Sequence, residues 1–186
     1  MWARAVRLEG RLVTLEPLTS RHVDGLRSAA GDPLIWRWLS TGFEDWLADA
    51  LAQTDDAVFT ILHRDVPVGS TRFLSIAPEH RRLEIGWTWL AHEVWGTGVN
   101  VEAKLLLLEH AFEELGALRV EFKTDARNER SRAALSALPA QFEGIFRAHM
   151  LLRGGERRDS AYYSVIADEW PEVKARLQAR LAARAT

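Results

Sequence analysis

Two glycines separated by one residue, Gly96-Thr97-Gly98, lie between an expected strand and an expected helix. Glycine lets the backbone adopt positive φ and approach a ligand closely. The first N–H groups of the following helix have no partner within the helix, and the helix dipole favours an anion there. The spacing therefore predicts a cradle for a phosphate or pyrophosphate, although a plain strand-to-helix turn would use the same residues.

The loop differs from two nucleotide-binding loops. No Gly-Lys-Ser/Thr follows it, and no third glycine stands at the offset of the dinucleotide fingerprint. A second polar element, Asn128-Glu129-Arg130-Ser131, opens the next helix after a strand. Two adjacent strands that each deliver a helix N-terminus to one sheet edge can hold one long, phosphorylated ligand.

The elements that must position these residues follow from hydrophobic periodicity. Apolar residues at Val101, Leu105, Leu108, Phe112 and Leu115 form one helical stripe. The other expected helices span about 19–30, 43–53, 128–138 and a terminal segment from residue 171, and the expected strands are 11–18, 57–62, 68–76, 83–90, 118–124, 142–152 and 160–166.

The order of these elements predicts the fold class. Short turns between 57 and 90 indicate antiparallel hairpins, whereas the crossover helix at 100–115 implies that its flanking strands are parallel. We therefore expect an α/β (α+β) protein with a single mixed, mostly antiparallel central sheet and helices on both faces.

Composition narrows the class of protein. The chain has 186 residues, 47% hydrophobic and 27% charged, which suits one globular domain over residues 1–186. A net charge of -2 makes nucleic-acid binding unlikely. The lack of cysteine and of a signal-like or membrane-spanning apolar run favours a cytoplasmic protein with no membrane partner, and the six histidines show no metal-binding spacing, so no metal is expected.

Several short blocks, in this order and spacing, resemble the GNAT superfamily of N-acetyltransferases. Within it the chain looks like the RimJ/RimL-like branch, which includes ribosomal-protein N-terminal acetylases. The similarity covers nearly the whole chain. The matching blocks are Leu83-Glu84-Ile85-Gly86-Trp87, Trp95-Gly96-Thr97-Gly98 with Glu102-Ala103, His110-Ala111-Phe112-Glu113, Arg127-Asn128-Glu129-Arg130-Ser131 and Arg158-Asp159-Ser160.

The resemblance implies the GNAT fold and an acetyltransferase that moves an acetyl group from acetyl-CoA, as co-substrate, to a primary amine in a ternary complex. It implies that main-chain groups of Trp87 to Leu90, Trp89 included, pair with the pantetheine arm, and that Asn128 binds this arm by its amide. The residues implied to hold the pyrophosphate are Trp95, Gly96, Thr97, Gly98, Val99 and Asn100.

Two charged residues, Glu93 and Lys104, lie near the loop. The family pattern has Gln or Arg where this chain has Glu93, so we expect this carboxylate to point away from the pyrophosphate. Lys104 lies about one turn inside the helix, and we expect it on a solvated face.

Glu84 is the first candidate for the general base, because GNAT enzymes often place a glutamate on this strand and burial would raise its pKa. The alternative is a surface carboxylate paired with Arg81 or Arg82. Strand alternation places Leu83, Ile85 and Trp87 on one face and Glu84, Gly86 and Thr88 on the other.

Ser131 is the candidate partner of the leaving sulfur, since the RimJ/RimL-like branch carries a serine here. The tyrosine that many GNAT enzymes use instead falls near Leu135 in this chain. The alternative is a first-turn serine that only bonds to the backbone. Tyr162 and Tyr163 are weaker acid candidates, one expected in the core and the other facing out.

The sequence does not identify the acetyl acceptor. Protein N-terminal amines, polyamines, amino acids and aminoglycosides are all candidates. Trp36, Trp38 and Trp46 fall in the region that shapes acceptor sites in the family, and they suggest a partly apolar wall. A homodimer is possible. Two alternatives to an enzyme remain, a non-catalytic acyl-CoA sensor or interaction module on the same fold, and a structural dimer with a vestigial pocket.

Overall fold

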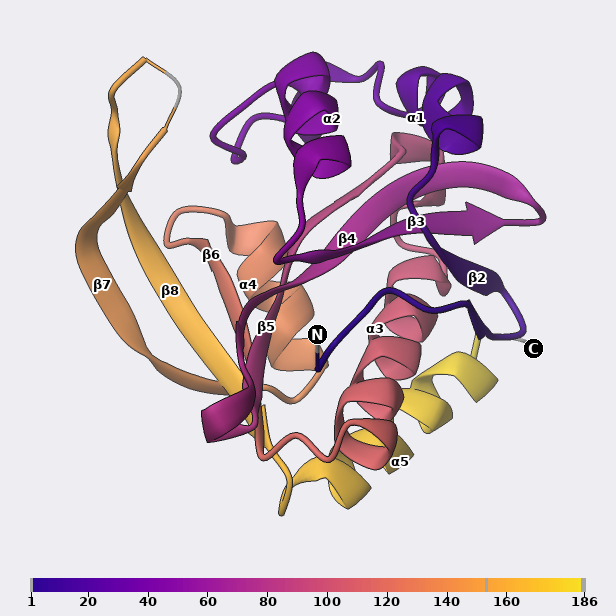
Figure 1. Ribbon diagram of the computed structural model, residues 1–186. Helices are drawn as coiled ribbons and strands as arrows, with labels where there is room; N and C mark the ends of the chain where they lie inside the picture. The colour runs from indigo at the N-terminus through magenta and orange to yellow at the C-terminus, as the bar shows by residue number, and fades with distance from the viewer. Residues whose placement is uncertain (1, 153, 185–186) are drawn as a thin grey trace.

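The structure is a computed structural model that describes residues 2–152 and 154–184 (Figure 1). One eight-stranded sheet has the order β1-β2-β3-β4-β5-β6-β8-β7. The strands are β1 (Leu8–Glu9), β2 (Val13–Pro17), β3 (Ala57–His63), β4 (Val66–Ala77), β5 (Arg82–Leu90), β6 (Arg119–Asp125), β7 (Gln141–Leu151) and β8 (Arg157–Ile166). The α-helices are α1 (Val23–Ala29), α2 (Phe43–Ala52), α3 (Val99–Glu109), α4 (Glu129–Ala137) and α5 (Trp170–Ala182).

The pairing of the strands confirms the predicted mixed sheet. β5 and β6 are parallel, and all other neighbouring pairs are antiparallel. Helix α3 connects the parallel pair and continues into a π-helical turn at His110–Glu114. Gly116 follows at φ +65°, a conformation that favours glycine and that ends the helix as expected.

The helices cover both faces of the sheet. On β3, Val58 packs with α2 residues such as Trp46, whereas the neighbouring Phe59 packs with the core that includes Leu107 of α3. Since adjacent strand residues point to opposite faces, α2 and α3 lie on opposite sides. Figure 1 shows α1 and α2 together on one side and α3 and α5 on the other.

A bulge at Trp87 breaks the alternation expected along β5. Trp87 has φ +49°, and the register between β4 and β5 shifts between Ser70 and Arg72. Trp87 consequently packs with Trp89 on the α2 side, and Thr88 turns to the α3 side, where it meets Lys104. The expectation that Glu84, Gly86 and Thr88 share a face is therefore wrong, because one irregular residue resets the period of two.

The same region opens the sheet. β5 and β6 pair only from Arg82–Arg119 to Glu84–Glu121, and beyond that point no pairing joins them.

No helix within the described part of the chain is long and apolar enough to cross a membrane.

Candidate active site

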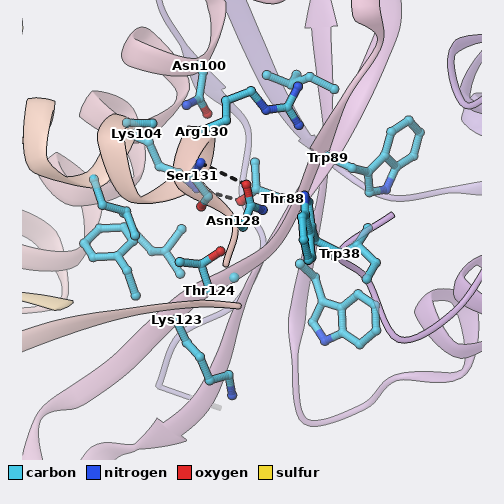
Figure 2. A pocket seen from close by; sticks show the side chains of 18 of the residues that line it. Trp38, Thr88, Trp89, Asn100, Lys104, Lys123, Thr124, Asn128, Arg130 and Ser131 are labelled. Carbon is cyan, nitrogen blue, oxygen red and sulfur yellow. Dashed lines mark hydrogen bonds between the residues drawn. The ribbon is translucent and has the colours of Figure 1, made fainter. Parts of the chain in front are cut away.

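A pocket of about 330 Å³ opens where β5 and β6 diverge (Figure 2). On the α3–α4 side it is lined by Asn100, Lys104 and Ser131, and on the opposite side by Glu84 and Arg158. The pocket thus passes between the two strands and joins the two faces of the sheet. Its lining from β5 and β6 consists of Glu84, Ile85, Gly86, Trp87, Thr88, Trp89 and Leu90 together with Phe122, Lys123 and Thr124.

The diverging strands leave main-chain groups without strand partners. β5 pairs with β4 on one edge, but its other edge beyond Glu84 faces the pocket. Backbone N–H and C=O groups need partners when buried. An extended ligand with amide groups can supply them, as an added strand does at a sheet edge.

The glycine loop lies at one end of this pocket and is held firmly. Gly96 has φ +74°, and a Cβ atom at Gly98 would come within 2.5 Å of Leu12 Cδ1. Thr97 Oγ1 donates to Val94 O (2.7 Å) and accepts from Val99 N (3.2 Å). Arg184, just beyond α5, donates to the carbonyl groups of Gly96 and Thr97. This arrangement fixes the amide groups at the start of α3, where an anion is favoured.

A cation that sequence reasoning left without a role stands beside the loop. The Arg130 guanidinium lies 3.4 Å from the ring centroid of Trp95, and both residues line the pocket. Trp95 is itself anchored, since its Nε1 donates to Leu90 O (2.9 Å). Glu93 is exposed and is not among the lining residues, which agrees with its expected orientation away from the site.

Asn128 and Ser131 lie together at the start of α4. Asn128 Oδ1 accepts the Ser131 N–H (3.1 Å), so Asn128 caps the helix while it lines the pocket. Within the described residues the Ser131 hydroxyl makes no hydrogen bond, so the alternative in which it only bonds to the backbone is not what the structure has. Figure 2 shows Asn128, Ser131, Thr88 and Lys104 gathered around the same space.

Glu84 is buried, with 3% of its surface exposed, and it faces the end of the pocket away from α3. Its Oε2 lies 3.3 Å from Lys123 Nζ. Burial raises the pKa of Glu84 even though Lys123 opposes the shift. The alternative of an exposed carboxylate paired with Arg81 or Arg82 is wrong, because Arg81 bonds to Gly116 O (2.8 Å) and Arg82 to Glu121 (3.5 Å).

The expectation that Lys104 lies on a solvated face of the helix is wrong. It is 6% exposed, not solvated, and its Nζ donates to Thr88 Oγ1 (2.7 Å) and Thr71 Oγ1 (3.4 Å). These hydroxyls are its only hydrogen-bond partners among the described residues, and no carboxylate neutralises it. Burial lowers the pKa of Lys104 to about 7. The sequence could have predicted this position, because Lys104 follows Asn100 by four residues and therefore lies on the same face of the helix.

The aromatic candidates separate into pocket and core. Trp38 lines the pocket, whereas Trp36 and Trp46 belong to the cluster under α2. Tyr163 is buried and Tyr162 half-buried, as alternation predicted. Within the part of the chain that the structure describes, no group of three or more histidine, aspartate or glutamate side chains is placed to hold a metal ion.

Comparison with known proteins gives the same assignment as the geometry. The family model described as "Acetyltransferase (GNAT) domain" matches residues 12–140. A Bacillus subtilis (strain 168) protein named "Putative ribosomal N-acetyltransferase YdaF" is 36% identical over 95 residues, which are 51% of this chain and 51% of that protein. Aligned regions thus span about half the length of the curated relatives.

Solved structures match over more of the chain. A GCN5-related N-acetyltransferase from Brucella melitensis has 31% identity and a TM-score of 0.92, with 97% of this chain and 87% of that chain covered. A structure from T. thermophilus, described as a "putative acetyltransferase", has 44% identity and a TM-score of 0.90, covering 97% and 100%. The predicted resemblance is confirmed, and the YdaF match agrees with its RimJ/RimL-like branch. This chain belongs to the GNAT acetyltransferase family.

Proposed function

We propose that this protein transfers an acetyl group from acetyl-CoA to a primary amine, with both substrates bound together. One observation carries the proposal, namely that β5 and β6 diverge beside a glycine loop at a helix N-terminus. The open strand edge suits the amide groups of pantetheine, and the loop suits a pyrophosphate. A Mycobacterium smegmatis RimJ in complex with CoA-disulfide shares this fold, at 21% identity and a TM-score of 0.81.

The coenzyme would lie on the α3–α4 side. In this proposal Trp87, Trp89 and Leu90 contribute main-chain groups to the pantetheine arm. Residues 95–100 bind the pyrophosphate, and the Arg130 guanidinium adds a positive charge beside them. The Asn128 side-chain amide is free to donate to the arm while its oxygen caps α4.

The acceptor amine would then approach from the opposite face, where Glu84 lies. Glu84 would remove a proton from the ammonium group, directly or through a water, and the free amine would attack the thioester carbonyl carbon. The C–S bond breaks as the amide forms, and the proton that the attacking nitrogen loses in this step passes to the thiolate. A glutamate with a raised pKa suits this role, because its basicity approaches that needed at neutral pH.

Two side chains on the α3–α4 side would assist at the thioester. The Ser131 hydroxyl, which makes no hydrogen bond within the described residues, would donate to the leaving sulfur. Lys104 Nζ keeps donor capacity beyond Thr88 and Thr71, and it would donate to the oxygen on which negative charge develops.

Coenzyme binding is the first test. Saturation with acetyl-CoA at a hundred times its dissociation constant should stabilise the fold by about 2.7 kcal/mol. For a chain of this size the melting temperature should rise by roughly 5 to 10 °C. No rise would contradict the coenzyme site and with it the proposed function.

The base is tested separately with Glu84→Gln. We expect this variant to bind acetyl-CoA normally and to lose about 10²- to 10⁴-fold in kcat, because a general base contributes that much. The matched control is Glu121→Gln, which changes the neighbouring carboxylate in register with Glu84 but outside the pocket lining. Full activity of Glu84→Gln would show that the base lies elsewhere. Binding without turnover in the wild type over a broad amine panel would favour the acyl-CoA sensor.

A further inference from the structure

Arg158 is a buried cation whose guanidinium has no hydrogen-bond partner among the residues that the structure describes. It lies on β8, is 7% exposed, and lines the same pocket as Glu84 and Lys123. Within residues 2–152 and 154–184 no hydrogen bond or ion pair holds its guanidinium, and its Nε is fully buried. Burial lowers the pKa of Arg158, although the charges of Asp125 and Glu84 oppose the shift.

The nearest carboxylates are already engaged. Asp125 accepts from the Arg127 main-chain N–H (2.9 Å), from Arg127 Nε (3.0 Å) and from Arg127 Nη2 (3.0 Å). Glu84 lies beside Lys123. Buried guanidinium groups are normally paired, since an unpaired buried charge is costly. An unpaired one that lines a pocket is therefore placed to receive an anion from a ligand.

The position of Arg158 indicates which of the two substrates would carry this anion. The glycine loop, Asn100 and Lys104 lie on the α3–α4 side of the sheet, which the coenzyme would fill. Arg158 and Glu84 lie together at the other end, and each contributes to the electrostatics of the other. The pocket lining at that end has two cations, Lys123 and Arg158, and one carboxylate, Glu84. This imbalance favours a ligand that brings both an ammonium group and an anion.

We infer that the acetyl acceptor carries a carboxylate close to its amine, and that Arg158 binds this carboxylate while Glu84 receives the amine. The inference rests on the proposed function. A guanidinium presents two parallel N–H groups that match a carboxylate, so it fixes orientation as well as charge. Such an acceptor is either a free amino acid or a peptide with an acidic residue near its N-terminus.

The experiment compares acceptors that differ only in this charge. With acetyl-CoA saturating, the wild type is assayed on free amino acids against their amides, and on peptides beginning Ser-Asp or Ser-Glu against Ser-Asn or Ser-Gln. We expect kcat/KM to be about 10- to 100-fold higher for the acid in at least one series, as a hydrogen-bonded charge pair gives. The series in which the preference appears identifies the source of the carboxylate.

Variants place the preference on Arg158. Arg158→Gln should abolish the discrimination between acid and amide, mainly through KM, and Arg158→Lys should restore part of it. The control is Arg157→Gln, which changes the exposed neighbour on the same strand and should keep the wild-type preference. The acetyl-CoA-induced rise in melting temperature, measured for each variant, shows that the fold and the coenzyme site persist.

The outcomes separate the two proposals. Equal rates for acid and amide with acetyl-CoA bound would overturn the anion site alone, and so would turnover of uncharged amines only. A preference for the acid that survives in Arg158→Gln would also overturn it, because the charge would then be recognised elsewhere. Failure of acetyl-CoA to bind the wild type would overturn the proposed function itself.

Discussion

Arg72 and Lys104 are both buried cations, but they lie on opposite faces of the sheet and have different hydrogen-bond partners. Arg72 on β4 faces α2 and is 1% exposed, and Lys104 on α3 is 6% exposed. Arg72 Nη1 donates to Asp49 (2.6 Å) and Asp56 (3.4 Å). Within the described part of the chain, the hydrogen-bond partners of Lys104 Nζ are the hydroxyl groups of two threonines, 2.7 and 3.4 Å away.

The surroundings of Arg72 indicate a structural role. Its guanidinium also lies 5.8 Å from the ring centroid of Trp46 and 5.2 Å from that of Trp87. Asp49 belongs to α2, so the ion pair connects this helix to β4 next to the rings of Trp46 and Trp87. Arg72 is absent from the lining of the pocket.

Lys104 is the opposite case. It lines the pocket, no carboxylate among the described residues offsets its charge, and its pKa falls to about 7. A buried charge that no counter-charge offsets, and that lines a pocket, is best explained by the site that it serves. Burial of a charge alone therefore does not separate structure from function, whereas for these two cations the presence of a counter-charge does.

The largest expected effect comes from breaking the structural member of the pair. Arg72→Met leaves the exposed Asp49 and the half-buried Asp56 without their cation, and we expect a loss of about 2–3 kcal/mol in the free energy of unfolding. Urea denaturation measures it. Arg27→Met serves as the control, because its pair with Glu44 is exposed and should contribute less than about 1 kcal/mol. Equal losses in the two variants would show that burial adds nothing here.

Lys104→Met should change stability in the other direction. The change removes an uncompensated buried charge, and Thr71 and Thr88 stay bonded to each other at 2.8 Å. We expect the free energy of unfolding at pH 7 to rise by roughly 1–3 kcal/mol. Acetyl transfer should fall by about 10²-fold, as for loss of one donor to a developing oxyanion.

A solvated lysine supplies the control for this variant. Lys174 on α5 pairs with Glu109 and Glu113 at the surface, and Lys174→Met should alter stability by less than about 1 kcal/mol and leave transfer unchanged. If Lys104→Met instead lost stability and kept full activity, Lys104 would be a structural residue like Arg72, and the contrast between them would be lost.

Local patterns in the sequence account for most of the fold. The period of two in the strands and the apolar stripe of α3 predicted the elements, and the crossover predicted the parallel pair β5–β6. The glycine loop and the cap at Asn128 were equally readable, because each depends on residues within a few positions.

The parts that failed depend on contacts between distant segments. The bulge at Trp87 arises where β4 and β5 pair unevenly, and it redirects Thr88 toward Lys104. Single-strand alternation cannot reveal such a shift. In the sequence, Arg72 and Arg158 look like ordinary charged strand residues. The structure distinguishes them, because Arg72 pairs with carboxylates and Arg158 has no hydrogen-bond partner among the described residues.

The most specific effect is the pH dependence of stability that Lys104 produces. The pKa of Lys104 is about 7 in the folded protein, whereas the ordinary value for a lysine is 10.5, so between these values the unfolded chain binds more protons. Stability therefore rises with pH across this window, by up to about 1.4 kcal/mol per unit from this group, and its cost is fully present below pH 7. Other groups also titrate, so the useful quantity is the difference between Lys104→Met and the wild type. We expect the variant to be the more stable protein at pH 6 to 7 and the gap to close steadily by pH 10. A gap that stayed constant from pH 6 to 10 would mean that Lys104 keeps an ordinary pKa in the folded protein, and the difference between the two buried cations would then be one of packing and not of charge.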